Sequence, residues 1–500
     1  MPTPPLPTLD VAPSLPRAVD VLVVGLADDG LRGVPAPVDK AFGKRFGTSL
    51  AAVAGSLGAT SAAGSLRTLP AAGDLRVVVV GLGEGEVGTG QLREAAGAGV
   101  REAAGLAGDG TVTVAVSLAG TGVEQLQAVA EGALLGSYRY AGVSSEPTPA
   151  SSITRVTVLH EGPTRTPSGA PVADVAAVVA RAVVTAREWV NVPANLLYPA
   201  SFAEEVQALV LDARITCEVL DETALEAGGY GGLLAVGGCS ARPPRLVRLS
   251  YRPRGAKAHL ALVGKGITFD TGGLNLKPAD GMYTMKCDMA GAAAVLAATH
   301  AIARLGLRVD VTAYAALAEN MPGGRAYRPS DVLTLHGGTT VENGNSDAEG
   351  RLVMADALAR SNADHPHLVV DVATLTGACV VALGERTAGV MATDDATAAQ
   401  VLAAADRVDE AMWQLPIPPE TRDKLDSKVA DLRSTSTDRW GGALSAAAFL
   451  REFVDDGTPW AHIDIAGPAF HTGSAYGHVS PGGTGVAVRT LISLAAQLAG

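Results

Sequence analysis

Hydrophobic runs alternate with segments of helical period along most of the chain. The four valines within Leu75–Gly81 are typical of a strand that is buried on both faces of a parallel sheet. Before residue 160 the same two patterns predict strands at 21–26, 112–118 and 153–159 and helices at 91–106 and 123–135. Strands that alternate with helices indicate an open, mostly parallel α/β sheet. Residues 1–19 precede this pattern, and we expect them to be disordered or loosely held.

Two segments rich in Pro, Ser and Thr, 146–152 and 161–171, interrupt the pattern and indicate a linker. A long amphipathic helix is expected directly afterwards, at Val172–Val190. The pattern then resumes, with strands expected at 246–251, 259–263, 309–317, 368–372, 389–392 and 460–465 and helices at 290–305, 352–362, 396–412, 443–453 and 486–498. We therefore expect an N-terminal domain at 1–165, a linker with a bridging helix at 166–190, and a second domain at 191–500.

The composition supports two large cores and no membrane span. Five hundred residues, 47% of them hydrophobic, exceed what one ordinary core holds. No apolar run reaches the roughly 20 residues that a membrane helix needs. Prolines near the N-terminus stand where a signal peptide would carry a basic start and an apolar core. The four cysteines lack CxxC spacing, which fits a reducing compartment. We expect a soluble, cytoplasmic protein.

Two other classes of binding find little support. The formal net charge of −12 argues against general binding to the phosphate backbone of nucleic acids, although a local basic patch stays open. The segment GLGEGE at 81–86 follows a strand, as a dinucleotide-binding loop would. Its last position is Glu86 where the fingerprint requires glycine, so we interpret it as a strand-to-helix turn.

Potential metal ligands gather between residues 265 and 349, among glycines and long apolar runs. They are Lys265, Asp270, Asp288, Asp347 and Glu349. Buried carboxylates require a positive partner, and two divalent ions that share a bridging carboxylate would supply it. Asp347 and Glu349 would point the same way in an extended segment. Asp288 occupies an N-cap-like position before a helix, and Asp270 follows a strand and its turn.

The residues alone leave these assignments open. A lysine binds a metal only as a neutral amine, and a lysine in the setting of Lys265 more often forms a structural ion pair. Without the neighbouring motifs, acidic residues placed like Asp347 and Glu349 are more often exposed residues of a loop. Cys287 lies beside Asp288, yet a small buried hydrophobe is its commoner role. HExxH and GxSxG are both absent, which argues against His-based zinc hydrolysis and against a serine hydrolase.

Several motifs, in order and spacing, resemble the cytosolic leucine aminopeptidase family of dinuclear metalloexopeptidases. They are VGKGITFDTGGLNLKP at 263–278, MKCDMAGAAAV at 285–295, AENMPGG at 318–324, NSDAEGRLVMADAL at 345–358 and DVATLTGA at 371–378, with shorter matches at 191–195, 240–249 and 462–469. The resemblance covers roughly residues 175–495. It implies a smaller N-terminal, macro-domain-like α/β domain and a larger catalytic α/β domain whose mixed, mostly parallel sheet is sandwiched by helices.

The resemblance also implies ligands for two metal ions in each subunit. Lys265, Asp270, Asp288 and Glu349 would hold the tighter ion, whereas Asp270, Asp347 and Glu349 would hold the more exchangeable one. Mn²⁺ or Zn²⁺ is expected, with Mg²⁺ as an alternative. The ions would activate a water that attacks the first peptide bond of a peptide with a free α-amine, leucine-like residues preferred.

Two cations would complete the chemistry that the resemblance implies. Lys277 would polarise the substrate carbonyl, and Arg351 would hold a bicarbonate that acts as general base. The residues that match the family's substrate pocket are Met285, Thr374, Gly377 and Ala466. Ser346 stands where the family usually has threonine and keeps the hydroxyl, so little effect is expected. Departures within 431–442 and at Phe470 bear on the shape of the pocket rim and on substrate preference rather than on the chemistry. A homohexamer is implied as well, and a DNA-binding regulatory or purely structural hexamer is the alternative function.

Overall fold

The computed structural model describes residues 4–108, 110–118, 120–146, 151–211 and 213–500. The chain forms two compact units. The N-terminal unit extends to Val184 and also contains Thr472–Pro481, and the C-terminal unit contains Thr185–His471 and Gly482–Gly500. The division falls inside the helix α5 (Val172–Asn191), which lies where the sequence predicts a long helix. No helix among the described residues is both long and apolar enough to cross a membrane.

The N-terminal unit is built on a seven-stranded sheet with the order β1-β7-β6-β2-β5-β4, and β3 pairs with β2. Most of its strand pairs are parallel, and β3 and β4 pair antiparallel with their neighbours. The strands are β1 (Thr8–Ala12), β2 (Val21–Ala27), β3 (Gly30–Arg32), β4 (Leu66–Ala72), β5 (Leu75–Gly81), β6 (Val112–Ser117) and β7 (Ile153–Leu159). The parallel sheet expected from the valine run is therefore present.

Helices cover this sheet from both sides. They are α1 (Ala36–Phe46), α2 (Leu50–Ser56), α3 (Thr89–Gly105), α4 (Val123–Gly136) and the start of α5. Successive side chains of a strand point to opposite faces. Val78 and Val80 accordingly lie in one core with α3 and α4, whereas Val77 and Val79 lie in a second core with α1 and α2. The valine run is hydrophobic throughout because both of its faces are buried.

The C-terminal unit is built on an eight-stranded mixed sheet with the order β16-β15-β18-β14-β10-β11-β9-β8. Its four central strands, β18, β14, β10 and β11, are parallel, and antiparallel pairs flank them. The strands are β8 (Ile215–Leu220), β9 (Arg245–Tyr251), β10 (His259–Asp270), β11 (Asp310–Asn320), β14 (Leu368–Ala373), β15 (Ala388–Ala392), β16 (Met412–Gln414) and β18 (Trp460–Asp464). The remaining short strands are β12 (Val332–Thr334), β13 (Thr340–Glu342), β17 (Leu432–Arg433), β19 (Phe470–His471) and β20 (Gly482–Gly483).

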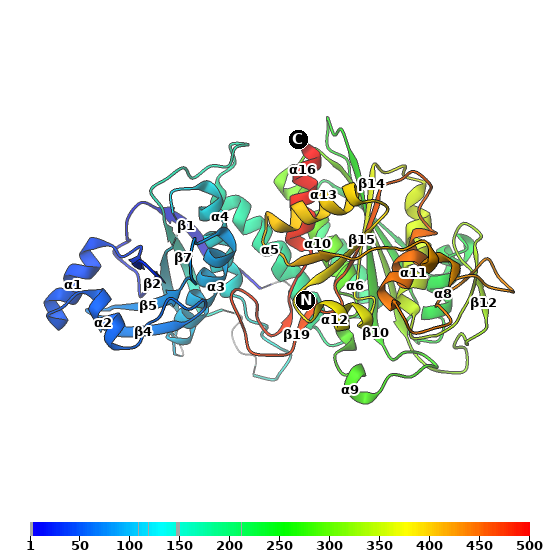
Figure 1. Ribbon diagram of the computed structural model, residues 1–500, viewed down its shortest axis with the longest axis horizontal. Helices are drawn as coiled ribbons and strands as arrows, with labels where there is room; N and C mark the ends of the chain where they lie inside the picture. The colour runs from blue at the N-terminus through cyan, green and yellow to red at the C-terminus, as the bar shows by residue number, and fades with distance from the viewer. Residues whose placement is uncertain (1–3, 109, 119, 147–150, 212) are drawn as a thin grey trace. The chain divides into compact units, whose positions relative to one another are not determined.

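Two layers of helices enclose this sheet (Figure 1). One layer contains α6 (Pro199–Val210), α10 (Ala290–Leu305), α13 (Asp395–Asp406) and α16 (Val488–Ala499). The other contains α8 (Gly231–Gly237), α11 (Glu349–Asn362) and α15 (Gly442–Arg451). Shorter helical segments are α7 (Glu222–Ala227), α9 (Ala279–Met282), η1 (Met285–Cys287), α12 (Gly377–Leu383) and α14 (Glu420–Asp423). The sandwich predicted from the sequence is confirmed.

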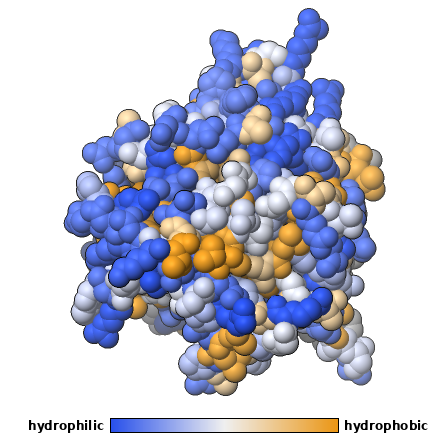
Figure 2. All heavy atoms as spheres, turned by 90° about the vertical axis from the view of Figure 1, so that its right-hand side faces the viewer, coloured by the Kyte–Doolittle hydropathy of each residue, from blue (hydrophilic) through white to orange (hydrophobic). Residues whose placement is uncertain are grey.

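The outer surface of the C-terminal unit is mixed in character. Figure 2 shows the side on which β12 and α8 lie, where hydrophobic residues form separate patches on a mostly hydrophilic face. Val332 of β12 is one of the unit's exposed apolar side chains. Most of the larger apolar side chains of β10, α10 and α11 are buried, among them Leu262, Leu296 and Leu352. The hydrophobic driving force is thus directed at the two faces of the sheet.

Several expectations about single elements were wrong. Thr8–Ala12 forms β1, which pairs with β7, although residues 1–19 were expected to be loose. Strand pairing with a distant segment leaves no local signal in so short a stretch. The helix expected to run to Met412 ends at Asp406, and Met412 begins β16 instead. The strand expected to end at Val263 continues to Asp270, which places more of the candidate site on the sheet itself.

Candidate metal centre

Strand β10 supplies two of the predicted ligands, Lys265 and Asp270. Its register against β11 shifts by one residue between Ile267 and Phe269, so that Lys265 lies opposite Ala316 and Asp270 opposite Asn320. Residues an odd number apart normally point to opposite faces of a sheet. The bulge adds one residue and returns Asp270 to the face that carries Lys265. The sequence gives no sign of this bulge.

Lys265 lies at the buried end of the centre. Its Nζ is 2.8 Å from Asp288 Oδ1, 2.8 Å from Glu349 Oε1 and 2.9 Å from the carbonyl oxygen of Thr374, to which it donates. The Thr374 hydroxyl donates to the same Asp288 oxygen at 2.7 Å. Asp288 follows η1, and Met289 rather than Asp288 is the N-cap of α10, which corrects the expected cap position. Burial raises the pKa of the neighbouring Cys287 to about 12, so its thiol keeps its proton.

The segment before α11 carries Asp347 and Glu349. We expected this segment to be extended, but Asp347 lies in a turn and Glu349 is the first residue of the helix. Hydrogen bonds hold the turn in place: the Ser346 hydroxyl donates to the carbonyl of Gly272 at 2.7 Å, and Asn275 Oδ1 accepts from Ser346 N at 2.9 Å. The two acids still approach the same site, because α11 begins at Glu349, directly after the turn that carries Asp347.

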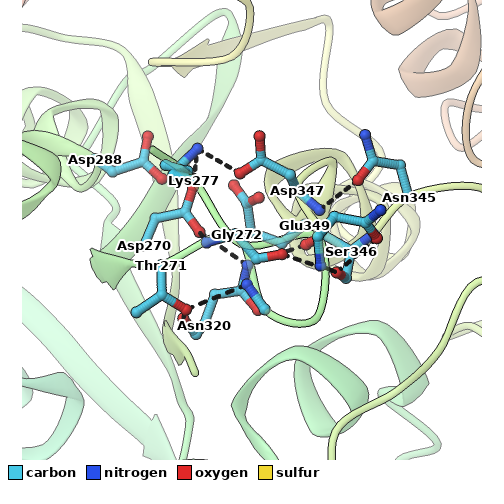
Figure 3. Close-up of polar contacts among 12 residues, drawn as sticks. Asp270, Thr271, Gly272, Lys277, Asp288, Asn320, Asn345, Ser346, Asp347 and Glu349 are labelled. Atoms are coloured by element: carbon cyan, nitrogen blue, oxygen red, sulfur yellow. Dashed lines mark hydrogen bonds and ion pairs between the residues drawn. The ribbon is translucent and has the colours of Figure 1, made fainter. Parts of the chain in front are cut away.

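Lys277 lies between two carboxylates at the more open end of the centre, as Figure 3 shows. Its Nζ is 2.7 Å from Asp270 Oδ2 and 2.5 Å from Asp347 Oδ1. Asp270 Oδ1 accepts from the backbone N–H of Gly272 and from Asn320 Nδ2, each at 2.8 Å. Each lysine is thus shared by two carboxylates, and six predicted residues meet in one cluster.

Burial and mutual repulsion control the protonation of this cluster. Burial, reinforced by the charge of Glu349, raises the pKa of Asp270 to about 6. Burial also raises the pKa of Asp288 well above its usual range, against the opposing charge of Lys265. Burial acts in the same direction on Glu349, yet the two lysines hold the pKa of that carboxyl below its ordinary value. The carboxylates therefore compete for too little positive charge.

The donor set fits divalent cations. Four carboxylates share two lysines, and the side-chain oxygens Asp288 Oδ2 and Glu349 Oε2 are buried without a hydrogen-bond partner among the described residues. One oxygen each of Asp270, Asp347 and Glu349 lies within 4.8 Å of the others. Carboxylate oxygens that converge in this way suit Mg²⁺, Mn²⁺ or Zn²⁺. Four carboxylates and two ammonium groups leave an excess of two negative charges, which a divalent cation would balance.

Arg351 lies two residues beyond Glu349, on α11. Its guanidinium is buried, Nη1 donates to the carbonyl of Ser434 at 2.8 Å, and Nε has no acceptor among the described residues. Burial lowers the pKa of Arg351 to about 10, which still leaves it charged at neutral pH. A buried arginine with unused donors is suited to binding a planar anion.

The four residues predicted for the substrate pocket differ in their links to the centre. Thr374 contacts the centre directly through Lys265 and Asp288, and Met285 begins η1, three residues before Asp288. Gly377 and Ala466 are connected more indirectly. The carboxylate of Asp464 accepts from the backbone N–H of Ala466 and of Leu375 and from the Thr376 hydroxyl, so it holds the loops after β14 and β18 together.

Two polar residues of the centre were not singled out from the sequence. Asn320 Nδ2 donates to Asp270 and also to the carbonyl of Ser346 at 3.0 Å, and the Tyr327 hydroxyl donates to that carbonyl at 2.7 Å. Asn320 ends β11 directly opposite Asp270, so it joins β10 to the turn before α11. Its place in AENMPGG at 318–324, one of the motifs that carry the resemblance, is the signal in the sequence that could have identified it.

The mixed α/β sheet and this cluster define an α/β protein with a buried, carboxylate-rich centre for divalent cations. Comparison with known proteins gives the family. The family model described as "Cytosol aminopeptidase family, catalytic domain" matches residues 184–492. The model described as "Cytosol aminopeptidase family, N-terminal domain" matches residues 23–147. The chain belongs to the cytosol aminopeptidase family and is a metal-dependent aminopeptidase. The family, the fold class and the enzyme class expected from the sequence are confirmed.

Two bacterial cytosol aminopeptidases are similar in sequence along nearly the whole chain. A probable cytosol aminopeptidase of Cutibacterium acnes is 49% identical over 509 residues, covering 100% of this chain and 98% of the relative. One of Streptomyces griseus is 48% identical over 514 residues, covering 98% of each. Among solved structures, the bottromycin maturation enzyme BotP in complex with Mn has a TM-score of 0.82 and 40% identity, covering 97% of this chain and 100% of BotP. A mutant of tomato leucine aminopeptidase has a TM-score of 0.87 and 29% identity, covering 99% and 98%.

Proposed function

We propose that the protein removes N-terminal residues, leucine-like ones preferred, from peptides with a free α-amine, and that the cluster around Lys265 and Lys277 holds two divalent ions. The observation that carries this proposal is the sharing of each lysine by two carboxylates within one site, where Asp270, Asp288 and Glu349 are buried. Such a cluster is costly to bury unless further positive charge enters it. The carboxylates form two groups, one around each lysine, and each group could hold one ion.

The residues divide between the two ions as follows. Lys265, Asp270, Asp288 and Glu349 hold one ion, and Asp270, Asp347 and Glu349 hold the second, so that Asp270 and Glu349 serve both. Lys265 takes part as a neutral amine. Although burial opposes it, Asp288 and Glu349 raise the pKa of Lys265, and a dication among these carboxylates would lower it. When bound, the two ions supply an activated water and Lewis acidity toward the peptide carbonyl.

The chain's own cations complete the reaction. Lys277 is partly accessible, and with Asp270 and Asp347 engaged as metal ligands its ammonium would be free to donate to the carbonyl oxygen of the scissile bond. Charge that develops on this oxygen is thereby stabilised. Arg351 would hold a bicarbonate through the N–H groups that do not donate to Ser434, and the bound anion would supply a general base for the reaction.

The remaining assignments are part of the same proposal. Met285, Thr374, Gly377 and Ala466 form the pocket for the first side chain, which accounts for the preference for leucine-like residues. Residues 191–500 form the catalytic domain, after an N-terminal domain at 1–165 and a linker with bridging helix at 166–190. The family name supports a cytosolic location. The subunits assemble as a homohexamer, and Mn²⁺ is the first metal to test because BotP was solved with Mn.

The deciding experiment is hydrolysis of leucine p-nitroanilide by metal-stripped protein, before and after addition of Mn²⁺, Zn²⁺ or Mg²⁺. We expect activity to appear only with metal and to need two ions per subunit, counted by elemental analysis. Asp288→Asn tests the ligand set, and Asp331→Asn, in an exposed ion pair with Arg328, is the matched control. Absence of activity on any unblocked peptide while both sites are filled would overturn the proposal. A gel shift at two salt concentrations would then test the DNA-binding alternative.

A further inference from the structure

A polar cavity of about 330 Å³ opens beside the metal centre. Its lining consists only of polar residues and glycines: Asn275, Gly344, Asn345, Arg351, Thr435, Ser436, Asp438, Arg439, Gly442 and Ser445. Asn345 Oδ1 accepts from the backbone N–H of Asp347 at 2.9 Å, and Arg351 lies two residues beyond Glu349. The cavity is therefore continuous with the segment that carries two of the proposed metal ligands.

The cavity contains uncompensated positive charge. Of its three charged residues, Asp438 is already engaged, because it lies 3.1 Å from Lys424 Nζ and accepts from the backbone N–H of Trp440 at 2.9 Å. Arg351 occupies the buried end of the cavity. Arg439 occupies the exposed end, where its guanidinium carbon lies 4.6 Å from the centre of the Trp440 ring.

The guanidinium of Arg439 is oriented by the Trp440 ring, and this contact uses none of its N–H donors. Stacking on an aromatic ring orients a guanidinium and leaves its N–H donors free at the edge. No carboxylate or carbonyl of the described residues accepts a hydrogen bond from Arg439. An oriented fork of free donors that faces a polar cavity is suited to a carboxylate.

We propose that Arg439 binds a carboxylate on the leaving part of the substrate, so that the protein favours dipeptides, whose second residue ends in a free α-carboxylate. This inference rests on the proposed function, because it assumes that the scissile bond lies at the metal centre. The cavity volume lies at the lower end of the range for ligand sites, which suits one residue better than a long peptide. Arg351 stays available for its own anion because it occupies the opposite, buried end.

The test compares three substrates: Leu-Gly, Leu-Gly amide and Leu-Asp amide. The first carries an α-carboxylate, the second carries none, and the third carries only a side-chain carboxylate. We expect KM for Leu-Gly amide to be about tenfold higher than KM for Leu-Gly, since a charge-assisted hydrogen bond is lost. Similar kcat values for the two substrates would indicate that the contact acts on binding. A Leu-Asp amide that matches Leu-Gly would identify the side-chain carboxylate as the preferred ligand and overturn the dipeptide assignment.

Variants of Arg439 complete the test. Arg439→Gln should raise KM for Leu-Gly to the value for Leu-Gly amide, and Arg439→Lys should restore part of the difference. Arg407→Gln, at another exposed arginine, should keep the wild-type ratio. A wild-type enzyme that treats Leu-Gly and its amide alike, or an Arg439→Gln variant that keeps the preference, would overturn the inference.

A binding measurement separates this inference from the proposed function. Calorimetric titration of metal-free protein with Leu-Gly and with its amide measures the difference in affinity between the two ligands without turnover. Tighter binding of Leu-Gly that disappears in Arg439→Gln supports the carboxylate site even if leucine p-nitroanilide is never hydrolysed. Equal binding of both ligands overturns it, whatever the activity of the enzyme.

Discussion

Gly350 packs directly against the side chain of Lys265. A Cβ atom at residue 350 would lie 2.5 Å from Lys265 Cε and 2.7 Å from its Nζ, closer than non-bonded atoms approach. Lys265 has nowhere to move, because its Nζ is held by Asp288, Glu349 and the Thr374 carbonyl. The glycine between Glu349 and Arg351 is thus required for close approach of α11 to β10, independently of its backbone conformation.

The first prediction concerns Gly350→Ala. The added methyl group should displace Lys265 from Asp288 and Glu349, and misplacement of a ligand by about 1 Å can cost roughly 100-fold in rate. We expect at least a tenfold loss of affinity for the tighter metal and a similar loss of kcat. Mn²⁺ titration of the apoprotein and steady-state kinetics provide the two measurements.

Gly281→Ala is the matched control, because a Cβ at Gly281 meets no atom within 4 Å. It should leave metal affinity and kcat within twofold of the wild type. A Gly350→Ala protein that binds Mn²⁺ normally would show that Lys265 is not a ligand, or that it adjusts without cost.

The second prediction separates Lys277 from the metal ligands. Lys277→Met removes a donor to the carbonyl oxygen but keeps the carboxylates that bind the ions. Loss of one such donor typically costs about 100- to 1,000-fold in kcat. We expect that loss with two metals still bound per subunit, measured by elemental analysis of the purified variant. A kcat within fivefold of the wild type would remove Lys277 from the proposed chemistry.

Much of the centre was predictable because its ligands lie in local motifs. Asp347 and Glu349 fall within one eight-residue segment, and the order of the surrounding motifs led to the family. The structure brings together all six charged residues named for the metal cluster, and Thr374 as well. The roles assigned to these residues stay predictions.

What the sequence could not provide depends on pairing between distant strands. The bulge that brings Lys265 and Asp270 to one face exists only in the register of β10 against β11. Asn320 acts through the same register, since it lies opposite Asp270. Strand β1 pairs with a strand some 145 residues later, so no local pattern marked it. Periodicity reports burial of a segment, and it does not report the partner that buries it.

The third prediction tests Asn320, which joins Asp270 to the turn before α11. Asn320→Ala removes the donors to Asp270 Oδ1 and to the Ser346 carbonyl. Loss of a group that orients metal ligands typically weakens metal binding by about 10- to 100-fold. We expect a shift of that size in Mn²⁺ titrations. Asn362→Ala, which removes a hydrogen bond to Phe453 O, is the control and should leave Mn²⁺ affinity unchanged. Equal affinities in the two variants would contradict an orienting role.

The last prediction concerns a buried pair that joins β14 to β18. His462 Nδ1 lies 2.5 Å from Asp371 Oδ1, Trp460 Nε1 donates to Asp371 Oδ2 at 2.7 Å, and all three side chains are buried. Although burial opposes it, Asp371 raises the pKa of His462 above the ordinary value of 6.5. The folded protein therefore binds this proton more tightly than the unfolded chain does. The resulting stabilisation is complete below pH 6.5 and is lost as the pH rises through the folded-state pKa.

Asp371→Asn removes the charge that holds this proton, so its cost should depend on pH. Near pH 6, breaking a buried ion pair should lower the free energy of unfolding by about 3–5 kcal/mol. At pH 9 the difference should be smaller, because the charged pair is lost as the pH rises through the folded-state pKa of His462. Once the ring is neutral, the difference should approach the value of a hydrogen bond from an uncharged ring to a carboxylate, about 1.5–3 kcal/mol. Urea unfolding at the two pH values, with chelator present to remove metal binding, measures both differences. A cost that is equal at pH 6 and pH 9 would mean that His462 does not change its protonation between these pH values, and it would contradict the prediction.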